Sequence, residues 1–107
     1  MSDRPVFFEE LYSLIVSRKQ ELPTGSYTAC LFRRGSDVIL KKVGEEAVEV
    51  VLAAKNGEPR AVIEETADLV YHLMVMLADQ GIEPVQIEAE LRRRFDRKVR
   101  PETATGP

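Results

Sequence analysis

Two segments of this chain combine a helical spacing of apolar residues with a cluster of acidic ones, and this combination constrains the fold more than any other feature. The first segment spans 36–55 and the second spans 59–80. In both, apolar residues recur every three or four positions, which predicts helices. Neither segment shows the strict alternation of a half-buried strand. The sequence therefore predicts two long helices that each carry an acidic cluster.

The ends of these two helices are marked by residues that commonly begin or terminate helices. Ser36 is expected to act as the N-cap of the first helix, and Asn56-Gly57 is expected to end it. Pro59 suits the first position of the second helix, and Gly81 follows its end. Because so few residues join the two helices, we expect them to form an αα-hairpin.

The rest of the chain adds shorter elements around this hairpin. Helices are expected over about 6–20 and 84–97, whereas 25–35 is expected to be a loop with at most one helical turn. A chain of 107 residues is long enough for a single modest core. The sequence therefore predicts an all-α domain of about four helices over 1–99, followed by a disordered tail over 100–107.

Composition excludes several classes of function. A net charge of −3 argues against nonspecific nucleic-acid binding, for which an excess of basic residues is expected. No apolar run approaches the ~20 residues that cross a membrane, and the N-terminus lacks the apolar stretch of a signal peptide. The single cysteine, Cys30, cannot form an intrachain disulfide. We therefore expect a cytoplasmic protein with neither membrane nor nucleic-acid partners.

The acidic residues of each helix gather on one narrow stripe. A helix advances about 100° per residue, so acids three or four positions apart share a face. The stripe of the first helix contains Lys42, Glu45, Glu46 and Glu49, and that of the second contains Glu64, Glu65, Asp68 and His72. Most of the remaining circumference is apolar, which predicts that both helices are buried on several sides.

Repulsion between the acids in these stripes needs compensation. Glu45 and Glu49 are four positions apart, as are Glu64 and Asp68, and each exposed like-charge pair costs roughly 0.2–0.5 kcal/mol. One interpretation is a solvated surface rich in glutamate. The other is a site for a hard divalent cation, Mg²⁺ or Mn²⁺, since carboxylate oxygens are the ligands that these ions prefer. Lys41, at the edge of the stripe with Lys42, would offset the charge of a substrate phosphate.

Two short motifs connect these residues to a known group of enzymes. The pattern E-x-x-E from Glu46 to Glu49, followed by E-x-x-D from Glu65 to Asp68, resembles the signature of the all-α nucleoside triphosphate pyrophosphatases, the MazG-like group. Three further stretches are similar to the phosphoribosyl-ATP pyrophosphohydrolase family in particular. They are Gly25-Ser26-Tyr27-Thr28, the run from Ile39 to Glu46, and the run from Ala67 to Leu73.

The resemblance implies an activity and an assembly. It implies Mg²⁺-dependent hydrolysis of phosphoribosyl-ATP to phosphoribosyl-AMP and pyrophosphate, the second step of histidine biosynthesis. It also implies a homodimer in which helices of both subunits surround the site. Several residues then receive roles: Glu46, Glu49, Glu65 and Asp68 as metal ligands, and Lys41, Lys42, Tyr27 and Arg33 as substrate contacts. Glu45 is the candidate for orienting or deprotonating water, with an outer-shell ligand and an ion-pair partner of Lys41 as its alternatives.

Two other functions remain open at this level. The same carboxylates would serve a housekeeping pyrophosphatase that acts on noncanonical nucleoside triphosphates. A helical dimerisation or binding module without catalysis would not need them, and the unpaired acids on both stripes disfavour it. His72 also has two interpretations, either as a partner of the Asp68 region of the site or as a hydrogen-bonded structural residue.

Overall fold

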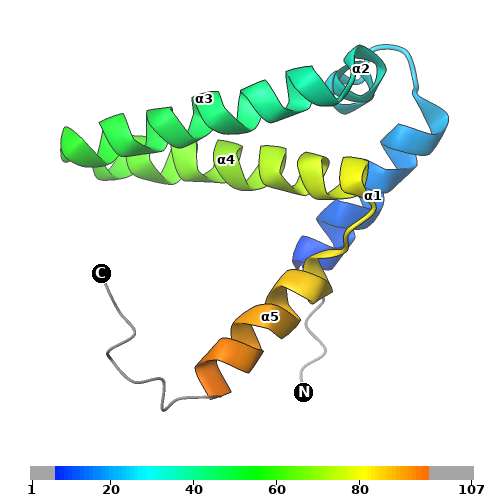
Figure 1. Cartoon of the computed structure of the whole chain (residues 1–107). Coiled ribbons are helices and arrows are strands. Elements are labelled where there is room, and N and C mark those ends of the chain that lie inside the picture. Colours follow the sequence, from blue (N-terminus) through cyan, green and yellow to red (C-terminus); the bar gives the residue numbers. More distant parts are fainter. Residues whose placement is uncertain (1–6, 97–107) are drawn as a thin grey trace.

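Five helices make up the chain in the computed structural model, which describes residues 7–96 (Figure 1). They are α1 (Phe7–Glu21), α2 (Tyr27–Arg34), α3 (Ser36–Lys55), α4 (Pro59–Gln80) and α5 (Pro84–Asp96). Residues 7–96 contain no strand. The prediction of an all-α fold is therefore confirmed, with one helix more than the four expected. The tail predicted over 100–107 lies outside the described residues.

The additional helix is α2, in the stretch expected to be a loop. The side chain of Ser26 caps its start, because its hydroxyl accepts a hydrogen bond from the backbone N–H of Ala29 at 3.0 Å. Gly35 ends it with φ at 103°, a conformation that favours glycine. A helix of eight residues is marginal alone, so burial of Thr28, Ala29 and Leu31 against the rest of the chain stabilises it.

The expected cap of α3 is also corrected. Gly35 occupies the N-cap position and Ser36 is the first helical residue, without a capping bond from a side chain. The Ser36 hydroxyl instead donates a hydrogen bond to a carboxylate oxygen of Asp79 at 2.6 Å. Because Asp79 lies in the last turn of α4, this bond holds the beginning of α3 against the end of α4.

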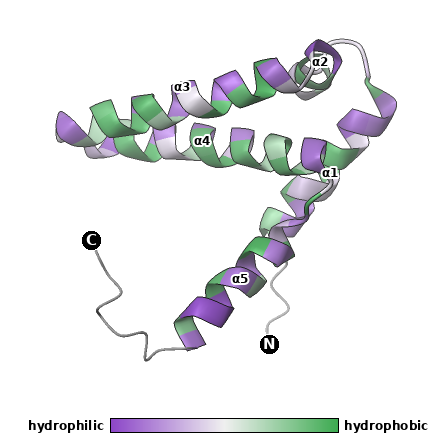
Figure 2. Ribbon diagram, viewed as in Figure 1, coloured by the Kyte–Doolittle hydropathy of each residue, from purple (hydrophilic) through white to green (hydrophobic). Residues whose placement is uncertain are grey.

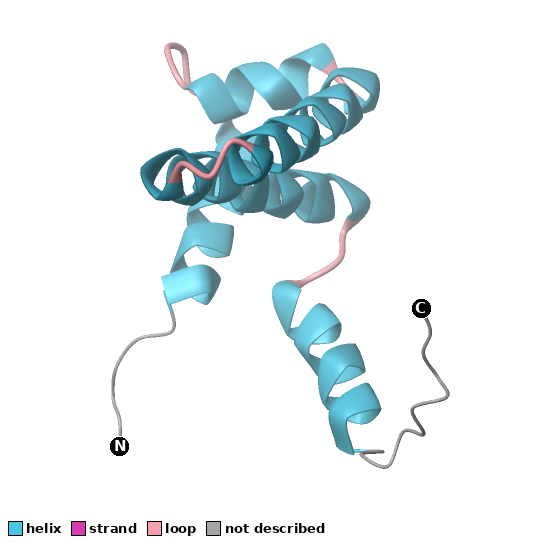
Figure 3. Cartoon of the chain, turned by 90° about the vertical axis from the view of Figure 1, so that its left-hand side faces the viewer, coloured by secondary structure: helices cyan, strands magenta, loops and turns pink. Residues whose placement is uncertain are grey.

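Helices α3 and α4 form the predicted hairpin and lie side by side along their length (Figures 1 and 3). Pro59 stands at the start of α4, as expected. Gly81 follows its end in the left-handed conformation with φ at 75°, which is the usual way for glycine to end a helix. The local signals in the sequence therefore placed the hairpin correctly.

The core occupies only one end of this hairpin. Its buried residues come from α1, α2, the first turns of α3 and the last turns of α4: Ile15, Leu31, Ile39, Met74, Val75 and Ala78. Toward the other end, Ala53 is the one buried hydrophobic residue of the described hairpin. The prediction that α3 and α4 are buried on several sides is therefore not met within one chain.

The outer face of α3, turned away from α4, is apolar and exposed, and green segments recur along this helix in Figure 2. We call this face the α3 stripe. It consists of Leu40, Gly44, Val48, Val51 and Leu52, all of which are exposed. An added Cβ at Gly44 would meet no atom of the described chain within 4 Å. The glycine is therefore not explained by close packing inside the chain.

Helix α5 extends away from the hairpin and contributes no buried residue (Figure 3). Its glutamates pair with arginines three or four positions later, as in the pairs Glu88–Arg92 and Glu90–Arg94. Hydrogen bonds from Arg93 and then Arg94 lower the pKa of Glu90 from 4.5 to about 2.

None of the described helices combines the length and apolar character needed to cross a membrane.

Candidate carboxylate site

The geometry of the hairpin brings the two acidic stripes together. Glu46 lies nine residues before the end of α3 at Lys55, and Asp68 lies nine residues after the start of α4. In the same way, Glu49 and Glu65 each lie six residues from the turn. In an antiparallel hairpin these residues are level in pairs, because both helices rise by the same amount per residue. Acidic residues that are far apart in the sequence are therefore close together in the folded hairpin.

Three of the four predicted metal ligands converge. One carboxylate oxygen from each of Glu46, Glu65 and Asp68 lies within 4.8 Å of the other two. The Glu46 side chain is only 12% exposed, Glu65 is half-buried, and Asp68 is exposed. The cluster thus opens to solvent on one side. Glu49 is exposed and does not belong to this three-residue group.

The charges of the cluster act on Glu65 in particular. Burial raises the pKa of the Glu65 carboxyl above its usual value of 4.5, and the charges of Glu49, Glu46 and Asp68 raise it further. Glu49 has the largest effect among these charges, so it is electrostatically part of the site. A set of oxygen ligands that repel one another in this way fits a hard divalent cation, which would remove the repulsion.

Both lysines predicted to contact substrate lie at the edge of this cluster. Lys42 pairs with Glu46 at 3.5 Å and with Glu45 at 3.9 Å, and Lys41 lies 4.0 Å from Glu45. Glu45 is therefore held between two ammonium groups and does not lie in the three-carboxylate group. Both lysines precede the acids with which they pair by about one helical turn, so these contacts offset part of the repulsion in the α3 acidic stripe.

The two other predicted substrate contacts come from α2. Tyr27 is 53% exposed, and its hydroxyl lies 2.8 Å from Nε2 of His72 on α4. His72 is one turn beyond Asp68, so Tyr27 stands beside the acidic face of α4. The Arg33 side chain is exposed and donates to the backbone carbonyl of Leu22 at 3.1 Å. No local pattern in the sequence indicates the Tyr27–His72 contact, because the two residues are 45 positions apart.

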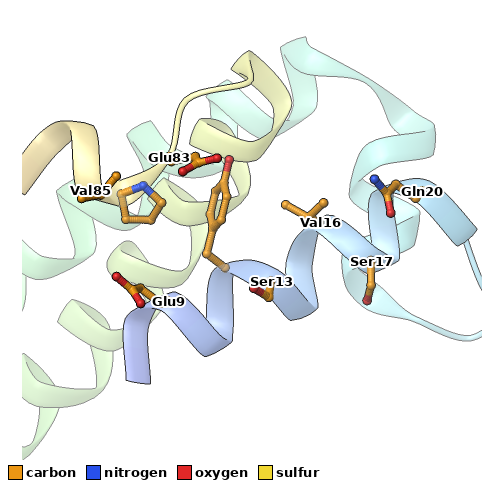
Figure 4. Close-up of a pocket in the computed structure, with 9 residues that line it drawn as sticks. Glu9, Ser13, Val16, Ser17, Gln20, Glu83 and Val85 are labelled. Atoms are coloured by element: carbon orange, nitrogen blue, oxygen red, sulfur yellow. The ribbon is translucent and has the colours of Figure 1, made fainter. Parts of the chain in front are cut away.

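A separate open pocket lies between α1 and the start of α5 (Figure 4). Residues of α1 such as Glu9, Ser13 and Ser17 form one side, and Glu83 and Val85 lie on the other. None of its lining residues has a predicted role, and none belongs to α3 or to the acidic face of α4. The carboxylate cluster is therefore the better candidate for the functional site.

The raised pKa of Glu65 has a consequence for stability that can be measured without activity. In the metal-free protein, its contribution to the free energy of unfolding is present below pH 4.5 and is lost as the pH rises through the raised pKa. In EDTA at pH 7, we therefore expect Glu65→Gln to melt at a higher temperature than the wild type. This difference should shrink as the pH falls to about 4. A Glu65→Gln protein that is no more stable than the wild type at pH 7 would contradict the repulsion.

Fold and site together define an all-helical protein whose hairpin presents clustered carboxylates of the kind that hold a divalent cation beside phosphates. The phosphoribosyl-ATP pyrophosphohydrolase family matches residues 8–95, which is most of the chain. The chain therefore belongs to this family. The resemblance seen in the short motifs thus extends over α1 to α5.

Individual proteins similar to this chain carry the name of the same enzyme family. A phosphoribosyl-ATP pyrophosphatase of Pelotomaculum thermopropionicum is 55% identical over 83% of this chain and 91% of its own length. The enzyme of the same name from Geobacter sulfurreducens is 48% identical over 89% of this chain and 88% of its own length. A third, from Geobacter metallireducens, is 45% identical over the whole chain and 98% of its own length.

Proposed function

We propose that this chain hydrolyses phosphoribosyl-ATP to phosphoribosyl-AMP and pyrophosphate, the second step of histidine biosynthesis. The bond between the α and β phosphorus centres is broken, and water supplies the oxygen that completes the two products. Membership of the family supports the substrate. The observation that carries the chemistry is the convergence of Glu46, Glu65 and Asp68 within 4.8 Å on two facing helices.

We further propose that Glu46, Glu65 and Asp68 hold Mg²⁺, or Mn²⁺ in its place, with Glu49 as a fourth ligand. The donor set fits, because it consists of mutually repelling carboxylate oxygens that are partly shielded from solvent. Bound Mg²⁺ would supply positive charge against the phosphates and acidify a water molecule. Glu49 is included because it lies level with Glu65 in the hairpin and its charge raises the pKa of that residue.

The remaining residues of the site act on the substrate and on water. Lys41 and Lys42 offset phosphate charge at the edge of the cluster, where Lys42 already lies 3.5 Å from Glu46. Glu45 is proposed to orient or deprotonate the attacking water, and its carboxylate lies 4.0 Å from Lys41 and 3.9 Å from Lys42. Tyr27 and Arg33 are proposed to contact the nucleotide from α2.

The assembly proposed for this activity is a homodimer in the cytoplasm. The α3 stripe supports the dimer, because an exposed apolar face along a whole helix is typical of an interaction surface. A second copy covering this stripe would complete the bundle whose core fills only one end of the hairpin in a single chain. The cytoplasm fits a highly charged nucleotide substrate, which does not cross membranes unaided.

A substrate panel tests the proposed activity directly. Purified protein with Mg²⁺ is expected to release pyrophosphate and phosphoribosyl-AMP from phosphoribosyl-ATP much faster than it releases pyrophosphate from ATP or from noncanonical triphosphates. The gene should also restore growth without histidine to a bacterial strain that lacks this step. Equal rates on phosphoribosyl-ATP and on free triphosphates would instead favour a housekeeping pyrophosphatase.

A further inference from the structure

His72 is the only histidine of the chain, and its ring is almost fully buried, at 4% exposure. Its Nδ1 lies 2.8 Å from the backbone carbonyl oxygen of Asp68, one turn earlier in α4. Because a carbonyl oxygen only accepts, the ring must carry its proton on Nδ1. In the neutral ring Nε2 is then an acceptor, and the Tyr27 hydroxyl donates to it at 2.8 Å. The hydrogen-bond network thus assigns the tautomer of His72 and the donor direction of Tyr27.

The packing around His72 restricts its ring further. Tyr27 and Tyr71 both meet it edge to face, with centroids at 5.8 Å and 5.5 Å from the imidazole. The hydroxyl of Tyr71 also hydrogen-bonds to that of Thr28, the next residue along α2. The first turn of α2 is thus attached to α4 by two neighbouring contacts. With both nitrogens bonded and two rings against it, the imidazole has one orientation.

The Thr28–Tyr71 and Tyr27–His72 hydrogen bonds have different structural effects. Thr28 is buried at 6% exposure, so its bond to Tyr71 serves the packing of α2. Tyr27 is 53% exposed and lies outside the core, so its bond to His72 adds little to the packing of the chain. The bond instead fixes the orientation of an exposed aromatic ring. This ring stands beside the face of α4 that carries Asp68 and Glu65.

We propose that His72 is a positioning residue that holds the Tyr27 ring as a fixed surface for the base of the substrate. This proposal rests on the function proposed above, since it assigns the adenine of phosphoribosyl-ATP to Tyr27 while the carboxylate cluster faces the phosphates. An aromatic ring fixed in advance loses no rotamer freedom when the base stacks on it. The hydroxyl is occupied by His72, so the flat faces of the ring are its means of contact with substrate.

Steady-state kinetics of four variants test the role of His72. His72→Leu keeps the volume of the side chain but removes the acceptor, and Tyr27→Phe removes the donor. Each is expected to raise KM for phosphoribosyl-ATP about threefold to tenfold, the size of one net hydrogen bond, with a much smaller change in kcat. His72→Gln offers an amide oxygen to Tyr27 and should recover part of the loss. Tyr27→Leu removes the stacking surface and should raise KM at least about fivefold.

A double-mutant cycle and a matched control separate positioning from stability. Because His72 acts through Tyr27, His72→Leu should raise KM no further in a Tyr27→Leu background. Tyr71→Phe removes the neighbouring bond to Thr28, so it should lower the melting temperature while KM stays within about twofold of the wild type. Its ring remains, and the hydroxyl that is removed is the one bonded to Thr28 of α2.

Three outcomes would overturn the proposal. An unchanged KM for Tyr27→Phe would do so even if the His72 variants failed to fold, since Tyr27 is exposed and its substitution leaves the core intact. Fully additive effects of His72→Leu and Tyr27→Leu on KM would also overturn it. The third outcome is wild-type protein without activity on phosphoribosyl-ATP, which would refute the proposed function as well. The first two outcomes would refute only the positioning role of His72.

Discussion

Asp68→Asn is expected to lower Mg²⁺-dependent release of pyrophosphate from phosphoribosyl-ATP by at least about 100-fold, because even partners of metal ligands are commonly worth 10–100-fold. Asp68 contributes an oxygen to the three-carboxylate group, and an amide is a weaker ligand without negative charge. The fold should persist, since the hydrogen bond to His72 uses the backbone carbonyl of this residue and the side chain is exposed. The measurement is initial rate against Mg²⁺ concentration, with circular dichroism as the check on folding.

Glu49→Gln tests whether the site has a fourth ligand. Glu49 lies outside the three-carboxylate group but has the largest charge effect on the pKa of Glu65. If it completes the metal site, Glu49→Gln should reduce activity as strongly as Asp68→Asn does. A loss below about tenfold would assign Glu49 to the surroundings of the site only.

Glu64→Gln is the matched control for both variants. Glu64 is adjacent to Glu65 on α4, but its side chain is 60% exposed and pairs with Arg60. Removing one exposed charge pair of this kind costs little, so the rate should stay within about twofold of that of the wild type. Calorimetric titration of the apo protein with Mg²⁺ and a nonhydrolysable nucleotide gives a second measurement. Near-full activity and normal Mg²⁺ binding in both Asp68→Asn and Glu49→Gln would refute the site.

The sequence predicted those parts of the fold that depend on local signals. Pro59, Gly81 and Pro84 mark helix ends through their own backbone preferences, and all three stand where they were expected. The facing of the acidic stripes was predictable for a similar reason. A short turn forces two helices to run antiparallel, and residues equally far from that turn then become level.

The parts that were missed depend on tertiary contacts. Helix α2 has only eight residues, which is too short for apolar periodicity to identify it. The local signals at its ends are Ser26, which caps its start, and Gly35, which ends it. Ser36 satisfies the usual preference for an N-cap, yet its hydroxyl bonds to Asp79 on a distant part of the chain. The Tyr27–His72 bond likewise spans 45 positions, and no local rule relates such residues.

The α3 stripe shows a limit of a different kind. An apolar pattern around most of a helix predicts burial, but it does not say which chain provides the cover. Val48 is 57% exposed and Val51 is 63% exposed, so residues 7–96 do not cover them. The prediction of burial on several sides was therefore wrong for a single chain, and coverage of the stripe by a second chain stays a prediction.

Val51→Glu is expected to convert the proposed homodimer into a monomer of 12.1 kDa. Val51 is the most exposed large hydrophobic residue of the α3 stripe, at 63% exposure, and burying an unpaired carboxylate in an apolar interface costs at least several kcal/mol. Glutamate forms helices at least as well as valine, so α3 itself should remain intact. Light scattering after size-exclusion chromatography measures the mass. If helices of both subunits surround the site, the loss of the dimer should also lower activity at least about tenfold.

Two further variants distinguish an interface from a surface that is merely apolar. Leu14→Glu makes the same change at a similarly exposed residue of α1, at 47% exposure, and should remain dimeric.

Gly44→Ala is the more sensitive probe of the α3 stripe. If Gly44 faces only solvent, the substitution should stabilise α3 by about 1 kcal/mol without other effect. If a helix of a second subunit packs against it, the added methyl group should weaken the dimer instead. Within residues 7–96, nothing beyond the adjacent part of α3 lies within 4 Å of that position. Wild-type protein that is monomeric at micromolar concentration, with full activity, would refute the homodimer.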